Sequence, residues 1–151
     1  MFGSGNDRMY VSSSNNLYKY AIGYYSNTSS NDFYQEISVE NPYRIIMSSY
    51  NNDFVWGVES YYGKVVKLDP DTLSVIKEYS GIDAPFKVVY SSFHQAFFVA
   101  GSYWVWKIDD VLGTVKAVYG VNNYKVSDID VSEDGKLCIL LSGISDNYIR
   151  V

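Results

Sequence analysis

The chain has 151 residues, the size of one ordinary domain, and it can bury a hydrophobic core without disulfides or metals. Hydrophobic residues make up 47% and charged residues 19% of the sequence, which excludes a disordered chain. The net charge is -5, the pI is about 4.7, and the 12 basic residues are scattered. We therefore expect no nucleic-acid partner, because such a partner needs a basic patch.

The content of aromatic residues and cysteine narrows the class further. Sixteen Tyr, seven Phe and three Trp bring the aromatic share to 17%, which favours β-strands, where flat side chains pack well on a pleated surface. The single cysteine, Cys138, excludes an internal disulfide and a multi-cysteine zinc site. No run of about 18 apolar residues occurs, so we expect no insertion into a membrane, and the first residues are too polar for a secretory signal.

The N-terminal part of the chain is predicted to hold three strands after a flexible start at residues 1–6. Short runs in which apolar and polar residues alternate are bounded here by Gly, Ser, Asn and Asp, which is typical of β-strands. No stretch has apolar residues at helical spacing, so the chain is expected to be all-β. The strands expected first cover residues 8–13, 17–23 and 33–38.

Two stretches in the middle of the chain repeat each other. NPYRIIMSSYNNDFVWG (residues 41–57) aligns without a gap with APFKVVYSSFHQAFFVA (residues 84–100), so that Pro42 lies over Pro85. The matching positions are proline, aromatic and β-branched residues and turn serines, which build strands rather than a shared active site. The strands expected in the two units cover residues 43–49, 53–59, 64–69 and 74–79, and then 86–92, 96–101, 104–109 and 114–119.

The repeat continues along the chain. KVVKLDPDTLSVIKEYSG (residues 64–81) aligns with YWVWKIDDVLGTVKAVYG (residues 103–120), with Lys67 over Lys107, and a third, weaker copy follows at residues 126–151. The period of roughly 40 to 45 residues is that of a four-stranded blade of a β-propeller. The strands expected in the last copy cover residues 126–132, 136–142 and 147–151.

The repeated unit resembles the YVTN and NHL families of β-propeller repeats. The resemblance lies in a proline before an alternating inner strand (Pro42, Pro85), in a polar turn at residues 132–135 where those repeats have Ser-Pro-Asp-Gly, and in a third strand that ends in Asp. It implies no particular function, because propellers serve as scaffolds, binding modules and enzymes. The resemblance implies antiparallel propeller blades: a partial blade at 8–38, blades at 43–79 and 86–119, and a partial blade at 126–151.

Two complete and two incomplete blades make an open arc or an incomplete ring. An open arc exposes two apolar blade faces. We therefore expect either that the chain is a piece of a longer propeller or that it completes a ring by self-association. A closed ring of four blades is the third alternative.

Few residues of this sequence suit catalysis or metal binding. His94, the only histidine, falls in a turn, where we expect a solvated side chain rather than a catalytic one. Cys138 lies in the apolar run LCILL and is expected to be buried. The run DPDT at residues 69–72 has oxygen ligands at alternate positions, but it is interpreted as a turn rather than a calcium site. We expect no catalytic residue, no metal and no cofactor, and an enzyme is disfavoured without being excluded.

Tyrosine-rich loops form a different kind of candidate site. In propellers, the loops that join the second strand to the third share one face with the connections between blades. Aromatic and amide side chains there suit stacking on a sugar or anchoring of a protein, and packing between blades is the competing interpretation of the same rings. The candidate binding residues are Tyr61, Tyr62, Tyr103, Trp104, Asn122, Asn123, Tyr124 and Asp146.

The function that the sequence favours is a non-catalytic repeat scaffold or binding module that presents this loop face to a protein or glycan partner. The compartment is left open, and the composition favours an extracellular or virion-surface setting. One alternative is a fragment of a propeller enzyme, such as a quinoprotein-like oxidoreductase, a lyase or a lactonase, whose site needs further blades. Another alternative is a structural arc that assembles with copies of itself.

Overall fold

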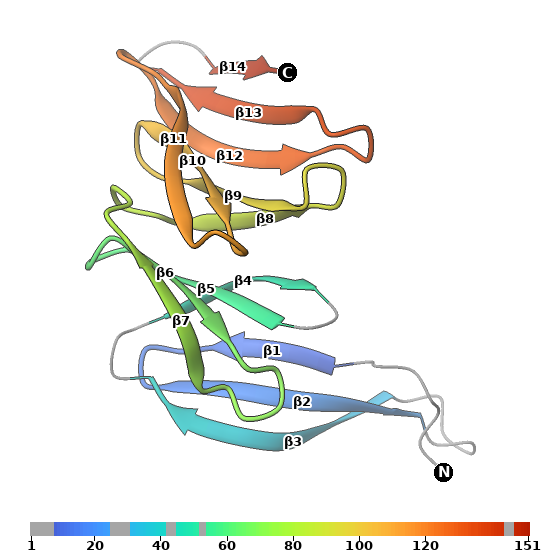
Figure 1. The fold of residues 1–151 in the computed structure, drawn as a ribbon. Coiled ribbons are helices and arrows are strands. Elements are labelled where there is room, and N and C mark those ends of the chain that lie inside the picture. The colour runs from blue at the N-terminus through green and yellow to red at the C-terminus, as the bar shows by residue number, and fades with distance from the viewer. Residues whose placement is uncertain (1–7, 25–30, 42–44, 52–53, 144–146) are drawn as a thin grey trace.

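The computed structural model describes residues 8–24, 31–41, 45–51, 54–143 and 147–151. Within them the chain forms four antiparallel sheets of three or four strands and no helix. The sheets follow one another in chain order, from the N-terminal sheet at the bottom of Figure 1 to the C-terminal sheet at the top. No helix long and apolar enough to cross a membrane occurs in this described part of the chain.

Each sheet is an antiparallel meander, because its strands pair in the order in which they follow along the chain. The first sheet consists of β1 (Arg8–Ser12), β2 (Asn16–Tyr24) and β3 (Asn31–Glu40), and the second of β4 (Ile46–Asn51), β5 (Phe54–Glu59), β6 (Lys64–Leu68) and β7 (Val75–Ser80). The third sheet consists of β8 (Lys87–Ser91), β9 (Ala96–Ala100), β10 (Trp104–Asp109) and β11 (Thr114–Gly120), and the fourth of β12 (Lys125–Val131), β13 (Leu137–Ser142) and β14 (Asn147–Arg150).

The first strand of the second sheet begins later than the sequence predicted. A strand was expected at residues 43–49, whereas β4 begins at Ile46, and Pro42 lies outside the described residues. The cause is the buried side chain of Asn41, whose Oδ1 accepts the N–H of Ile45 at 2.8 Å and whose Nδ2 donates to the carbonyl of Ile45 at 3.0 Å. Both backbone groups of Ile45 are therefore satisfied by a side chain instead of a neighbouring strand.

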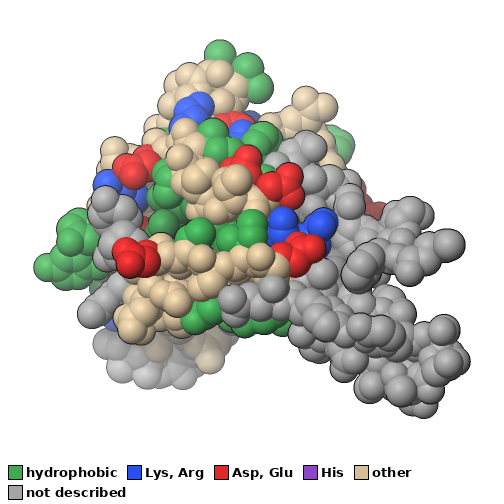
Figure 2. All heavy atoms as spheres, turned by 90° about the horizontal axis from the view of Figure 1, so that it is seen from below, with side chains coloured by type: hydrophobic (Ala, Val, Ile, Leu, Met, Phe, Trp, Pro, Cys, Tyr) green, Lys and Arg blue, Asp and Glu red, His purple; other side chains and the backbone are tan. Residues whose placement is uncertain are grey.

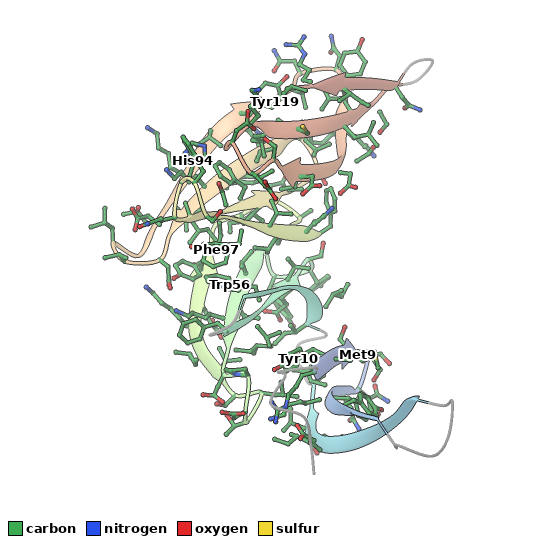
Figure 3. The ribbon with its side chains drawn as sticks, turned by 90° about the vertical axis from the view of Figure 1, so that its right-hand side faces the viewer. Met9, Tyr10, Trp56, His94, Phe97 and Tyr119 are labelled. Carbon is green, nitrogen blue, oxygen red and sulfur yellow. The ribbon has the colours of Figure 1, made fainter. Side chains whose placement is uncertain are left out.

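Apolar side chains fill three cores, one between each pair of successive sheets. Trp56 and Phe97 meet between the second and third sheets with ring centroids 3.8 Å apart (Figure 3). Leu17 and Leu68 belong to the core between the first and second sheets, and Ile139 to the core between the third and fourth. Because side chains alternate along a strand, the two inner sheets contribute to a core on each of their faces.

Contacts between neighbouring sheets show which position each strand occupies. The strands β4, β8 and β12 contact one another in succession and form the inner row of the stack. The second strands β5 and β9 also contact the inner strand of the sheet that follows, and β1 contacts β4 in the same way. β1 therefore occupies a second-strand position. Among the described residues, the first sheet has no inner strand and the fourth sheet has no fourth strand.

Both ends of the stack carry exposed apolar side chains. Figure 2 looks onto the first sheet, whose outer surface mixes apolar with acidic and basic side chains, and Met9 and Val11 of β1 are exposed. At the other end the side chain of Ile149 is 74% exposed. The expected burial of Cys138 was wrong, because this residue is only half-buried. It alternates with Ile139 and so lies on the outer face of the fourth sheet, which no described residue covers.

Candidate functional site

Four loops at one edge of the stack form the surface that the sequence singled out. They lie on the left in Figure 1. Backbone hydrogen bonds join them in pairs, because the N–H of Ile82 donates to the carbonyl of Gly63 and the N–H of Val121 donates to that of Tyr103. Loops within a sheet and connections between sheets therefore share one edge. We define the loop face by residues 60–63, 81–86, 101–103 and 121–124.

The most exposed aromatic pair of the loop face lies in the β5–β6 loop. Tyr61 is 90% exposed and Tyr62 61% exposed, and their rings meet edge to face with centroids 4.9 Å apart. Gly63 ends this loop with a φ of 64°, and a side chain there would lie 2.8 Å from the carbonyl oxygen of Ile82. The loop backbone is thus fixed by glycine and by its hydrogen bond to the next connection, while both rings face solvent.

The β9–β10 loop presents its aromatic residues differently. Tyr103 is exposed in the loop, and Trp104 is the first residue of β10. The ring of Trp104 lies directly on the backbone of Gly120, where an added Cβ would come within 2.4 Å of it. Trp104 therefore borders the loop face and packs on the backbone of its own sheet.

The last connection supplies the remaining candidates from the sequence. Asn122 and Asn123 are exposed on the loop face. Tyr124 is half-buried and packs against the core between the third and fourth sheets, so its ring serves the packing role that competes with binding. Asp146 lies outside the described residues.

A buried carboxylate lies next to the loop face. Glu59, the last residue of β5, is 2% exposed, and its Oε1 has no hydrogen-bond partner among the described residues. Burial raises the pKa of Glu59, an effect that the charge of Lys64 opposes and that of Glu78 reinforces. Sequence reasoning missed this residue, because a glutamate at the end of a strand gives no indication of burial.

The second feature that sequence reasoning missed is a carboxylate held between two sheets. Lys67 Nζ on β6 lies 2.5 Å from Oδ2 of Asp110, in the turn between β10 and β11, and the hydroxyl of Tyr79 donates to Oδ1. Lys77 Nζ donates to the carbonyl of Asp110 at 3.0 Å and lies 3.7 Å from Oδ1. We call Lys67, Lys77 and Tyr79 the second-sheet clamp.

The second-sheet clamp changes the titration of its members. Burial alone would raise the pKa of Asp110, but the hydrogen bonds from Lys67 and Tyr79 and the charges of both lysines outweigh it and hold that pKa below its ordinary value. The pKa of the Tyr79 phenol is raised by burial and by its hydrogen bond to Asp110. The clamp therefore binds the ionised form of a carboxylate.

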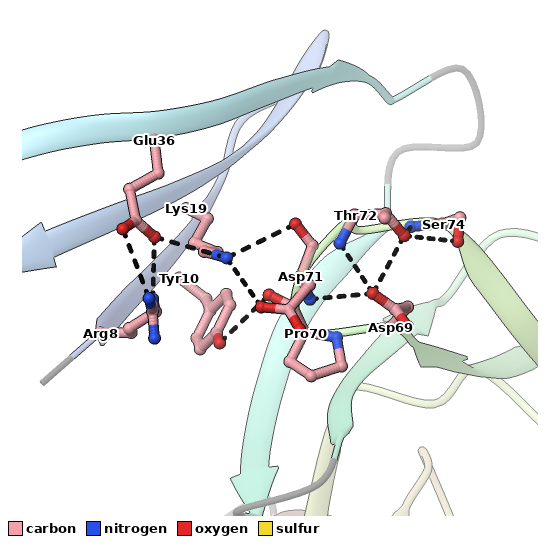
Figure 4. Close-up of polar contacts among 9 residues, drawn as sticks. All are labelled: Arg8, Tyr10, Lys19, Glu36, Asp69, Pro70, Asp71, Thr72 and Ser74. Carbon is pink, nitrogen blue, oxygen red and sulfur yellow. Dashed lines mark hydrogen bonds and ion pairs between the residues drawn. The ribbon is translucent and has the colours of Figure 1, made fainter. Parts of the chain in front are cut away.

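A related contact joins the first two sheets (Figure 4). Lys19 on β2 is buried, and its Nζ lies 3.1 Å from Oδ1 of Asp71 and 3.4 Å from Glu36. Beside it, the hydroxyl of Tyr10 donates to the carbonyl of Pro70 at 3.4 Å. Lys19 lies opposite Tyr10 across the strands, as Lys67 lies opposite Trp56 in the second sheet. Between the first and second sheets, and again between the second and third, a lysine beside an aromatic ring thus binds an aspartate of the following sheet.

The turn that carries Asp71 has the local structure that the sequence predicted. Oδ1 of Asp69 accepts the N–H groups of Asp71 and Thr72, at 2.9 and 2.7 Å, and the hydroxyl of Thr72 (Figure 4). These hydrogen bonds lower the pKa of Asp69. The residues at 69–72 form a side-chain-stabilised turn, and no group of three acidic, histidine or cysteine side chains suited to a metal occurs in the described ranges.

His94 joins two neighbouring turns. Its side chain is exposed, and Nε2 lies 2.9 Å from the carbonyl of Gly135 in the next sheet. The ring of Phe93 lies on the same glycine, where a Cβ would come within 2.4 Å of it and φ is 85°. The only histidine of the sequence therefore has a structural role, a contact between two turns of neighbouring sheets.

Comparisons with known proteins extend the description of the fold. No family model and no curated protein matches the sequence. The structure is similar to that of hydrazine synthase from Kuenenia stuttgartiensis, with a TM-score of 0.75 and 17% sequence identity. The likeness covers 95% of this chain and 42% of that chain, so the present chain spans less than half the length of the protein it matches. At this level of identity the likeness shows a shared fold.

Proposed function

We propose that the four sheets are successive blades of a β-propeller built from a repeat of the YVTN or NHL type. Support comes from the meander order within every sheet and from the inner row β4, β8 and β12. The structural likeness to a longer chain over 95% of the present one also supports it. In this arrangement each blade covers its neighbours, and the loops of successive blades meet on one face.

We further propose that the chain acts as a non-catalytic module that binds a protein partner through the loop face. The observation that carries this proposal is the exposed pair Tyr61 and Tyr62 on a backbone fixed by Gly63. Exposed tyrosines on a fixed loop bind partners well, because each ring offers a large contact area at a low entropic cost and a hydroxyl for one hydrogen bond. Exposed Asn122 and Asn123 on the same face add polar contacts.

A matched pull-down tests this proposal. Wild-type chain, the double variant Tyr61→Ser/Tyr62→Ser and the control Val111→Ser/Leu112→Ser are immobilised, and proteins captured from an extract of the source organism are quantified by mass spectrometry. The control removes two side chains that are 94% and 73% exposed but lie in the β10–β11 turn, away from the loop face. We expect a partner that the wild type and the control capture in equal amounts. The amount captured by the tyrosine variant should be at least tenfold lower.

Two results would contradict the proposal. Identical capture by all three chains would show that the tyrosine pair binds nothing. Loss of the captured partner after enzymatic removal of its glycans would show that the loop face recognises sugars, to which aromatic rings also stack, instead of a protein surface.

A further inference from the structure

Asp83 lies in the connection between the second and third sheets, next to the exposed tyrosine pair. The N–H of the preceding residue, Ile82, donates to the carbonyl of Gly63 at 3.1 Å, and Gly63 directly follows Tyr61 and Tyr62 in the chain. Ile82 is buried in the core, whereas Asp83 is exposed. The hydrogen bond therefore fixes the backbone beside Asp83 against the loop that presents both rings.

A second loop with an exposed aromatic residue adjoins Asp83 from the other side. A Cβ at Gly101 would collide with the carbonyl oxygen of Asp83, so the β9–β10 loop, which carries Tyr103, packs directly on this residue. The next residue along the chain, Ala84, has a φ of 40°, a conformation that is strained for a residue with a Cβ. Strained backbone persists where its surroundings hold it, and it is frequent at binding sites. Asp83 therefore occupies a fixed position between two aromatic loops.

The loop face has a carboxylate but no cation of its own. Asp83 is the only charged residue among residues 60–63, 81–86, 101–103 and 121–124. Its side chain makes no hydrogen bond or ion pair with any residue that the structure describes. Lysines directly follow three of these segments, and none of them pairs with Asp83: Lys64, Lys87 and Lys125. An exposed carboxylate beside exposed rings is thus left for a cation from outside the chain.

Elsewhere the chain itself holds cations with an aspartate and an aromatic ring. Lys67 Nζ lies 3.5 Å from the centroid of the Phe54 ring and is hydrogen-bonded to Asp110. Lys77 Nζ lies 5.0 Å from the centroid of the Tyr79 ring and 3.7 Å from the same carboxylate. The attraction of a cation to the face of an aromatic ring adds to its ion pair. The loop face supplies the same combination of ring and carboxylate without the cation.

We propose that the loop face binds an arginine of its protein partner, whose guanidinium stacks on one ring of the pair Tyr61 and Tyr62 and forms an ion pair with Asp83. Arginine fits better than lysine, because its planar guanidinium stacks flat on a ring and donates two parallel hydrogen bonds to one carboxylate. The net charge of -5 also favours a basic partner. Recognition of this kind rests on the binding role proposed above for the loop face.

Peptide selection supplies the probe for this inference. A library of random twelve-residue peptides on phage is selected on the immobilised full chain, and peptides that also bind the variant Tyr61→Ser/Tyr62→Ser are discarded. We expect arginine to be enriched at one position of the remaining peptides at least threefold over the starting library, and more strongly than lysine. The tightest of these peptides is synthesised with a fluorescent label, and its binding is measured by fluorescence anisotropy.

A double-mutant cycle then tests the ion pair. Replacement of the enriched arginine of the peptide by citrulline keeps its size and removes its charge. We expect citrulline to weaken binding to the wild-type chain at least tenfold, but binding to Asp83→Asn less than threefold. The matched control is Glu133→Gln, which changes an exposed carboxylate in the turn between β12 and β13 and should keep the tenfold preference for arginine. The two peptides are also compared on one unchanged wild-type chain, so that comparison does not depend on how a variant folds.

Three outcomes would overturn the inference. Two of them leave the proposed function standing: peptides that need the tyrosine pair but show no enrichment of arginine over lysine, and an equal loss of affinity with citrulline on wild type and on Asp83→Asn. The third, a selection that yields no peptide dependent on the tyrosine pair, would contradict the binding role of the loop face as well.

Discussion

The carboxylate of Asp110 in the third sheet accepts hydrogen bonds from two side chains of the second sheet, so its removal should weaken the packing of these two sheets on each other. We expect Asp110→Asn to lower the free energy of unfolding at pH 7 by about 1–3 kcal/mol, the usual cost of disturbing a hydrogen bond to a charged group. Denaturation in urea measures this loss. The matched control is Asp83→Asn, which changes an exposed carboxylate on the loop face and should leave stability within about 0.5 kcal/mol of wild type.

The same substitution should change how stability depends on pH. Because the folded state lowers the pKa of Asp110 below its ordinary value of 3.8, the stabilisation is complete above that value and is lost as pH falls through the folded pKa. The gap between wild type and Asp110→Asn should therefore narrow below about pH 4. A gap that stays constant from pH 7 to pH 2 would show that the ionised carboxylate contributes nothing.

Glu59 should behave in the opposite way. Burial raises its pKa, so the folded state disfavours the ionised form above the ordinary pKa of 4.5. Glu59→Gln should raise the free energy of unfolding at pH 7, on the order of 1 kcal/mol, and this gain should fade as pH falls through the raised folded pKa towards 4.5. Urea denaturation at several pH values measures both effects. The control is Glu133→Gln, which changes an exposed carboxylate in the turn between β12 and β13. A less stable Glu59→Gln at pH 7 would show that the buried charge has a favourable partner.

At the scale of the strands, the sequence predicted more than it did for single contacts. Alternation of apolar and polar residues is a local property, so β10 was expected at residues 104–109 and lies there. The predicted start of β4 was wrong, because the side chain of Asn41 hydrogen-bonds both backbone groups of Ile45. The alternation of apolar and polar residues gives no indication of such a contact.

Contacts between sheets were the part that the sequence did not predict. The repeat placed Lys67 over Lys107, but it did not show that the partner of Lys67 is Asp110, 43 positions further along in the next sheet. That pairing depends on how two sheets stack, which is a tertiary property. Exposure of Tyr61 and Tyr62 was consistent with the candidate site, whereas the burial of Tyr124 depends on the neighbouring core.

For the whole molecule, the stacking order of the sheets determines which sheet unfolds locally first. Each inner sheet packs on two cores, whereas the first and fourth sheets each pack on one. Because stability in such stacks is a sum of nearest-neighbour terms, opening should begin at the ends. We expect amide hydrogens of β5, β6, β9 and β10 to exchange at least tenfold more slowly than those of β1 and β14, as measured by mass spectrometry.

Measurement at two protein concentrations provides the control for this prediction. If β1 and β14 were as protected as the inner strands, and if their protection grew with concentration, the end sheets would be covered by another copy of the chain. Uniform protection that does not depend on concentration would contradict the nearest-neighbour description itself.

The strand register of the third sheet, with Lys107 opposite Lys116 and Val105 opposite Tyr119, repeats that of the second sheet and has a consequence for how a gene of this kind can lengthen. An in-frame tandem duplication of residues 81–120 would insert a new sheet that meets, on both sides, side chains in equivalent positions to those the third sheet meets already. The duplicated Asp110 would reach Lys107 and Tyr119 without any further mutation. Unequal recombination can therefore add whole sheets to this fold in one event, and the aspartate that locks each new joint is inherited with the sheet that needs it.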